Sequence, residues 1–222
     1  MNIHSKIALR NLLISTLPQL AEFYEHVRLL RFSRKWRTQG WSVPLPYLIK
    51  RSILKAEALR NRAEILIETG TFLGDTPWFF RRDFQQIISI EVDPTLVALA
   101  KKRFRQWPNV SILEGDSATI LPKILPDLKG RIAFWLDGHY SAGITGRGKK
   151  DCPIWEELGA ITNSCQDQWT LLIDDARCFG TDPAYPTIEE VRTFLTNRST
   201  EHSFRVENDV IFFTPTNLTN HR

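Results

Sequence analysis

"AEILIETGTFLGDT", residues 63–76, is the stretch of sequence that decides the fold. Its apolar first half predicts a buried strand, and a helical pattern begins near residue 74. Between the two, Gly70 and Gly74 let the backbone approach a ligand closely, because glycine adopts conformations that other residues avoid. The spacing of these glycines is looser than the GxGxxG pattern of dinucleotide sites, so an ordinary tight turn stays an alternative at this point.

Outward from this stretch, short apolar runs alternate with helical patterns. Strands are predicted at 63–70, 86–93, 110–116, 131–138 and 169–176. Helices are predicted between and after them, at 74–82, 94–106, 118–128, 153–164 and 186–198. Residues 203–208 and 210–215 predict a closing antiparallel pair. We therefore predict an α/β fold, a Rossmann-like, doubly wound, seven-stranded and mostly parallel sheet with a C-terminal antiparallel hairpin.

The first 60 residues differ in character from the rest of the chain. Residues 5–33 predict an amphipathic helix interrupted at Pro18, and a second helix begins near Tyr47. We predict an N-terminal helical extension over 1–60 and one globular domain over 61–222. Much of the net charge of +4 lies in the extension, and a solvated basic surface explains it better than a nucleic-acid footprint. The apolar face of the first helix is a candidate surface for a homodimer.

Composition places the chain among soluble proteins. Its 222 residues are enough for one large α/β domain that needs no disulfide or metal for stability. The three cysteines form no CxxC pair, which indicates free thiols in a reducing compartment. No apolar run approaches the length of a membrane span, and no secretion signal is evident. We expect a cytoplasmic protein.

Ligands of open α/β sheets bind beyond the carboxyl ends of the strands, so the residues there are candidates for a site. Glu91 ends the second strand about 20 residues after Gly70, a position from which an acid can bind ribose hydroxyls. Asp93 precedes Pro94 and is assigned mainly to a helix cap. Asp116 and Ser117 follow the third strand and can either cap a helix or bind an adenine edge.

Three carboxylates follow the fourth and fifth strands: Asp137, Asp174 and Asp175. Like charges held close repel one another, and a hard cation such as Mg²⁺ removes that cost. The alternative is that each of them caps a turn or faces water. His139 lies two residues after Asp137 and can act as a general base near neutral pH, although a lone histidine is more often structural.

Together these features resemble a known family over about residues 60–214. The glycine turn, the acidic end of the second strand, "GDS" at 115–117 and the closing hairpin resemble the class I S-adenosylmethionine-dependent methyltransferases. The acids after strands four and five resemble the metal-dependent macrocin and novobiocin-type sugar O-methyltransferases. "ETGTFLGDT" and "WLDGHYS" also resemble a widespread group of bacterial methyltransferase-like proteins. Some relatives have Asp at the position of the base, where this chain has His139.

The resemblance implies S-adenosylmethionine and Mg²⁺ as cofactors and a small-molecule hydroxyl, such as that of a sugar or glycosylated natural product, as acceptor. Residues 1–60 would form the wall or lid over the acceptor, and His139 would be the base. The cofactor residues would be Glu68, Gly70, Thr71, Gly74, Thr76, Glu91, Asp116, Ser117 and Asp137. Asp137, Asp174 and Asp175 would hold the metal. An RNA or protein methyltransferase and a non-catalytic methyltransferase-like protein remain alternatives.

Overall fold

One sheet organises most of the chain. The computed structural model describes residues 27, 30–38, 40, 43–137, 152–165 and 169–216. The strands are β1 (Ile65–Thr69), β2 (Gln86–Glu91), β3 (Val110–Glu114), β4 (Ile132–Leu136), β5 (Trp169–Ile173), β6 (His202–Glu207) and β7 (Val210–Pro215). They form a seven-stranded sheet in the order β3-β2-β1-β4-β5-β7-β6. The predicted fold class is confirmed.

The strands from β3 to β5 are parallel, and β7 runs antiparallel between β5 and β6. Every residue of β1, β4 and β5 is buried, as expected for strands covered on both faces. The central register pairs Ile67 with Ile88 on one side and with Phe134 on the other. The order reverses between β1 and β4, so the crevice beyond their carboxyl ends is the expected ligand site.

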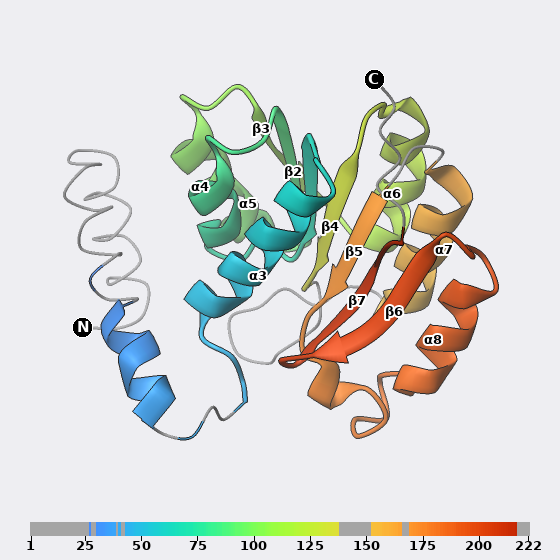
Figure 1. Cartoon of the computed structure of the whole chain (residues 1–222). Coiled ribbons are helices and arrows are strands. Elements are labelled where there is room, and N and C mark those ends of the chain that lie inside the picture. Colours follow the sequence, from blue (N-terminus) through green and yellow to red (C-terminus); the bar gives the residue numbers. More distant parts are fainter. Residues whose placement is uncertain are drawn as a thin grey trace. The chain divides into compact units, whose positions relative to one another are not determined.

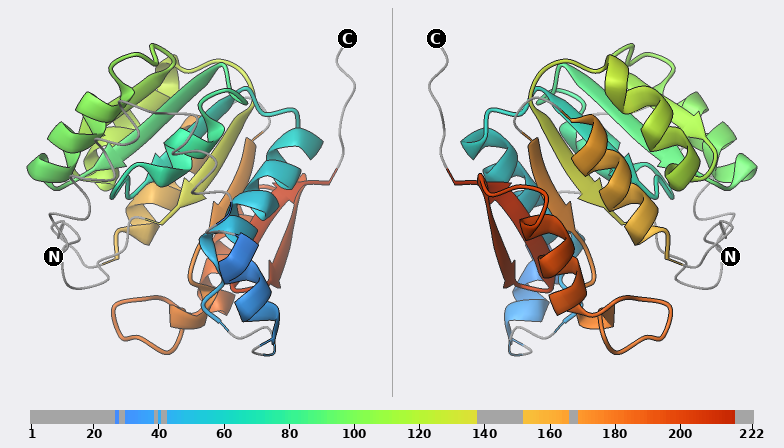
Figure 2. Two further views of the ribbon diagram at one scale, coloured as in Figure 1. Left: turned by 90° about the vertical axis from the view of Figure 1, so that its left-hand side faces the viewer. Right: turned by 90° about the vertical axis from the view of Figure 1, so that its right-hand side faces the viewer.

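Helices cover both faces of this sheet (Figures 1 and 2). The helices α4 (Asp75–Phe80) and α5 (Pro94–Phe104) lie on one face, and α6 (Ser117–Ile124), α7 (Ile154–Ser164) and α8 (Ile188–Thr196) lie on the other. Short 3₁₀ turns follow at Leu125–Asp127 and Ala176–Cys178. The α8 helix begins with a capping box, in which Thr187 and Glu190 satisfy each other's backbone N–H groups.

The chain divides into two compact units, Met1–Ile53 and Leu54–Arg222. The division falls inside α3 (Tyr47–Arg60), whereas the sequence predicted a domain boundary at the end of that helix. In the first unit, residues 30–38 are helical, and most of the predicted helix over 5–33 lies outside the described residues. Among the described helices, none combines the length and apolar character that crossing a membrane requires.

The hairpin between β6 and β7 closes with a two-residue turn. Asn208 and Asp209 have φ angles of 51° and 61°. Positive φ at both central residues is the signature of a type I′ turn, in which asparagine and aspartate are favoured over other non-glycine residues. The turn brings Asp209 to the end of β5, where the Ala176 N–H donates to the Asp209 carbonyl over 2.9 Å.

Candidate active site

The glycine turn after β1 is tied to the end of β2. Gly70 and Gly74 have φ angles of 86° and 73°, which side-chain-bearing residues rarely adopt. The Gly70 and Thr71 N–H groups donate to the Ile90 carbonyl over 2.9 and 3.2 Å. Gly74 precedes α4, and a Cβ atom there would lie 2.9 Å from a ring carbon of Phe104. The turn is therefore present, with both glycines favoured by their positive φ and Gly74 also by lack of space for a side chain.

Glu91 holds this turn through its carboxylate. The buried side chain accepts from the Phe72 N–H over 2.8 Å at Oε2 and from the Val92 and Asp93 N–H groups over 3.0 Å each at Oε1. A carboxylate offers about four acceptor positions, so roughly one remains for a ligand. Glu91, which the sequence predicts to bind a ribose, therefore also fixes the backbone around the predicted cofactor site.

A chain of buried hydroxyl contacts lies behind the turn. The Ser89 hydroxyl donates to Glu68 Oε2 over 2.6 Å, and Thr71 Oγ1 lies 2.6 Å from Ser89 Oγ. Glu68 and Ser89 are register partners on β1 and β2. Sequence reasoning singled out Glu68 and Thr71 but missed Ser89. The available signal was a small hydroxyl residue inside the otherwise apolar strand "QIISIE".

The residues after β2 and β3 are helix caps in this structure. Asp93 accepts from the Thr95 and Leu96 N–H groups, and Asp116 accepts from the Ala118 N–H over 3.0 Å. Ser117 is buried, and its hydroxyl donates to Glu157 Oε1 on α7 over 2.6 Å. The adenine contact predicted for Asp116 and Ser117 stays a prediction, and Glu157 is a residue that sequence reasoning missed.

Other predicted cofactor residues lie close to these elements along the chain. Thr76 is buried in the first turn of α4. Asp137 follows β4 directly, and its N–H donates to the Thr69 carbonyl at the end of β1 over 3.1 Å. Asp137 therefore stands at the point where the strand order reverses. His139 and the loop around it, residues 138–151, lie outside the described residues.

The acidic pair after β5 adopts a tight local conformation. Asp174 is buried, and its N–H donates to the Leu136 carbonyl over 3.0 Å. Asp175 has a φ of 56°, and its N–H donates to Asp174 Oδ1 over 2.7 Å. The Arg177 guanidinium contacts Asp175 Oδ1 over 2.8 Å and also pairs with Asp209 from the hairpin turn. Arg177 therefore already places a positive charge beside Asp175, one of the three predicted metal ligands.

Electrostatics around Arg177 agree with this pairing. Burial favours the neutral form, but the hydrogen bonds and charges of Asp175 and Asp209 outweigh it and raise the pKa of Arg177 above its ordinary value. Within the described residues, no group of three histidine, cysteine, aspartate or glutamate side chains is arranged to hold a metal ion. The magnesium site predicted for Asp137, Asp174 and Asp175 stays a prediction.

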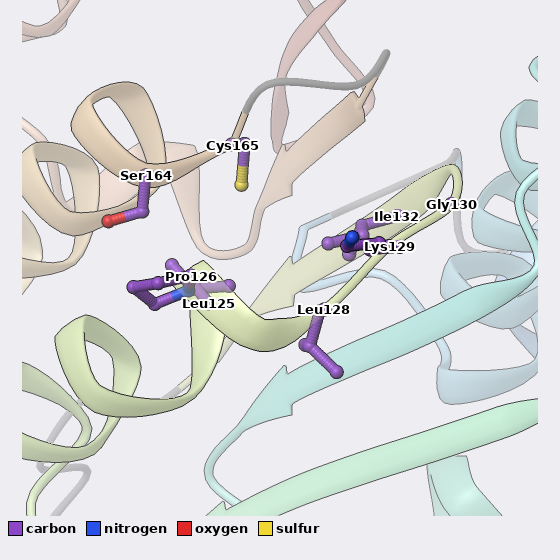
Figure 3. A pocket seen from close by; sticks show the side chains of 8 residues that line it. All are labelled: Leu125, Pro126, Leu128, Lys129, Gly130, Ile132, Ser164 and Cys165. Atoms are coloured by element: carbon purple, nitrogen blue, oxygen red, sulfur yellow. The ribbon is translucent and has the colours of Figure 1, made fainter.

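A cavity of about 220 Å³ lies elsewhere on the domain (Figure 3). Its lining includes Leu125, Lys129 and Ile132 before and at the start of β4, with Ser164 and Cys165 at the end of α7. Because Ile132 begins β4, this cavity lies by the amino end of that strand. The predicted cofactor residues follow the carboxyl ends, so the cavity is not their binding site.

The fold is that of the class I S-adenosylmethionine-dependent methyltransferases, as the resemblance in sequence implied. No protein-family model and no curated protein matches the sequence. Solved structures, in contrast, are similar to this chain in fold. The O-methyltransferase TomG of Streptomyces achromogenes, involved in tomaymycin synthesis and solved with S-adenosylmethionine, has a TM-score of 0.55 and 18% identity, over 83% of this chain and 86% of that chain.

Two further structures show the range of this similarity. The Podospora anserina methyltransferase PaMTH1, solved with S-adenosylhomocysteine, has a TM-score of 0.55 and 13% identity over 98% of this chain and 97% of its own. The N-methyltransferase NodS of Bradyrhizobium japonicum, also solved with S-adenosylhomocysteine, has a TM-score of 0.50 and 14% identity over 81% and 96%. At identities this low, the structural similarity shows a shared fold and nothing more. The fold alone does not decide which acceptor atom receives a methyl group.

Proposed function

We propose that this protein is an S-adenosylmethionine-dependent methyltransferase that acts on a hydroxyl group of a small molecule, such as a sugar or glycosylated natural product. The observation that carries the proposal is the junction of the glycine turn with Glu91. This supports the proposal because, in a fold of this class, the junction holds the turn backbone and one carboxylate at the strand ends next to the point where the strand order reverses.

The residues present fit the proposed cofactor. The turn at Gly70 and Thr71 would face its methionine end, together with Glu68, and the open acceptor position of Glu91 suits a ribose hydroxyl. Asp116 lies at the next strand end along the chain, where an adenine would reach it. The bound cofactor supplies an electrophilic methyl group on a sulfonium sulfur. This chain would contribute position, and holding two reactants in line can supply roughly 7–11 kcal/mol of the barrier.

The acceptor hydroxyl has to lose a proton as the methyl group is transferred. We propose His139 as the base, because imidazole changes protonation near neutral pH and His139 follows the strand that ends at the crevice. Asp137, two residues earlier, would orient the acceptor or the base. Magnesium assistance stays a prediction from the sequence, and a bound ion would have to compete with Arg177 for Asp175.

Calorimetric titration with S-adenosylhomocysteine tests the cofactor. The wild-type protein should bind it, and Glu91→Gln should weaken binding about ten- to a hundredfold. The reason is that an amide group cannot accept from all three backbone N–H groups, and each lost bond to a charged acceptor is worth roughly 1.5–3 kcal/mol. Glu114→Gln is the matched control, because Glu114 is the exposed register partner of Glu91 on β3. Absence of wild-type binding would overturn the proposed function.

A screen of hydroxylated acceptors with labelled S-adenosylmethionine tests the reaction. Sugars and glycosylated compounds should accept the methyl group, and His139→Ala should reduce turnover without changing cofactor binding. Running the screen with EDTA decides the magnesium prediction, which full activity in chelator would refute. If His139→Ala were fully active on an acceptor found in this way, the proposed base would be wrong although the cofactor was right.

A further inference from the structure

Glu157 is a fully buried acid to which the proposed chemistry gives no role. It lies in the first turn of α7 with 0% of its surface exposed. Its Oε1 accepts from the Ser117 hydroxyl over 2.6 Å. Its Oε2 is buried, as is Thr69 Oγ1, and within the described part of the chain neither atom has a hydrogen-bond partner. Buried polar atoms without partners are rare and costly, so this arrangement requires an explanation.

The neighbours of Glu157 belong to the proposed cofactor site. Ser117 begins α6 directly after Asp116, the residue proposed to face the adenine. Thr69 ends β1, just before the glycine turn, and its carbonyl accepts from the Asp137 N–H. One side chain on α7 therefore lies near the ends of two segments that carry proposed cofactor residues. It is hydrogen-bonded to the Ser117 hydroxyl, and the Thr69 hydroxyl lies close enough to affect the pKa of Glu157.

The protonation of Glu157 is set by these surroundings. Burial raises the pKa of Glu157 to about 7, against the lowering effect of the Ser117 and Thr69 hydroxyls. The charged groups that act on it among the described residues are Asp116 and Glu156, and both add to the rise. The neutral acid has an O–H group that can donate a hydrogen bond to Thr69 Oγ1. The ionised form places a second negative charge beside Asp116 in the protein interior, where charge is expensive.

We propose that Glu157 is a positioning residue that holds Asp116 and the end of β1 in the geometry needed to bind S-adenosylmethionine. This inference rests on the proposed function. Glu157 does not touch the cofactor in this scheme. It acts by locking α7 to the two strand ends, and it does so best while it is uncharged.

Binding of S-adenosylhomocysteine measured by calorimetry from pH 5.5 to 8.5 tests the inference. Wild-type affinity should fall as the pH rises through about 7, by up to about tenfold, because ionised Glu157 favours separation of α7 from the strand ends. Glu157→Gln keeps a neutral group that can both donate and accept, so its affinity should stay within about threefold of the wild-type value at pH 6 and remain flat with pH.

Two variants complete the experiment. Thr69→Val preserves the shape and removes the hydroxyl, and it should weaken binding at pH 6 about three- to tenfold, the equivalent of one neutral hydrogen bond. Glu189→Gln on the exposed surface of α8 removes a carboxylate without contact to the site and should follow the wild-type curve. Thermal unfolding of each variant reports whether it is folded.

The outcomes separate the two proposals. If the wild-type protein binds no S-adenosylhomocysteine at any pH, the proposed function fails and the inference fails with it. If the wild-type protein binds but Glu157→Gln keeps the same fall with pH, or Thr69→Val binds as tightly as the wild type, Glu157 is not a positioning residue. In that case the proposed function still stands.

Discussion

Gly74→Ala is the substitution whose effect follows most directly from the structure. Two costs add at this position. The backbone has a φ of 73°, and an alanine held in that left-handed conformation costs roughly 1–2 kcal/mol. The new Cβ would also lie 2.9 Å from a ring carbon of Phe104, which is buried with 3% of its surface exposed. Overpacking of this kind costs roughly 1–3 kcal/mol. We expect a total loss of about 2–5 kcal/mol in the free energy of unfolding.

Gly159→Ala provides the matched control. Gly159 lies inside α7, and a Cβ there meets no atom within 4 Å among the described residues. Alanine is the better helix former by about 0.5–1 kcal/mol, so this variant should be more stable than the wild type. Urea denaturation followed by circular dichroism measures both variants against the wild-type protein. If Gly74→Ala unfolded within 0.5 kcal/mol of the wild type, the close approach of the turn to α5 would be wrong.

Three further predictions concern stability. Between pH 4.5 and 8 the wild type should lose about 3 kcal/mol of stability relative to Glu157→Gln. The reason is that the pKa of Glu157 is raised from 4.5 to about 7, so the stabilising neutral form is lost as the pH rises to that value. Urea unfolding at pH 4.5 and 8 measures this difference, and an equal change in both proteins would contradict it. Thr187→Ala should cost about 1 kcal/mol through loss of the α8 capping box, seen as a lower melting temperature, whereas Thr196→Ala at the other end of α8 should not. Asp209→Asn keeps the turn geometry but weakens the bonds of this residue to Arg177, so we expect the free energy of unfolding to fall by about 1–3 kcal/mol. Denaturant titration measures this loss, and unchanged stability would show that the pairing does not stabilise the fold.

The fold could be predicted because its strands carry a local signal. Runs such as "AEILIETG" and "WTLLIDDA" are centred on consecutive apolar residues, which is typical of strands covered on both faces. The helices between them have ordinary turn and cap residues. The glycine turn was predictable for the same reason, since Gly70 and Gly74 stand where positive φ is needed.

The partners of the site residues were less accessible to sequence reasoning. Glu91 was assigned to a ligand, but most of its acceptor positions go to backbone N–H groups of its own neighbourhood. The sequence did not show that Arg177 would pair with Asp175 or that Asp209, from a distant turn, would join them. Glu157 was not singled out from the sequence at all, although it is fully buried against Ser117. Each of these roles depends on side-chain contacts, some between neighbouring residues and some between segments far apart in the chain, and the apolar periodicity of the sequence does not report them.

The insertion of β7 between β5 and β6 has a consequence for synthesis of the chain. While the ribosome has completed only residues up to β5, that mostly apolar strand has an open edge available for pairing with other chains. Because β7 is the seventh strand in the sequence yet the neighbour of β5, that edge is covered only after nearly all of the described sequence has emerged. Premature termination before Val210 should therefore yield aggregates in place of a smaller folded protein, and a nascent chain stalled there is a natural client for chaperones.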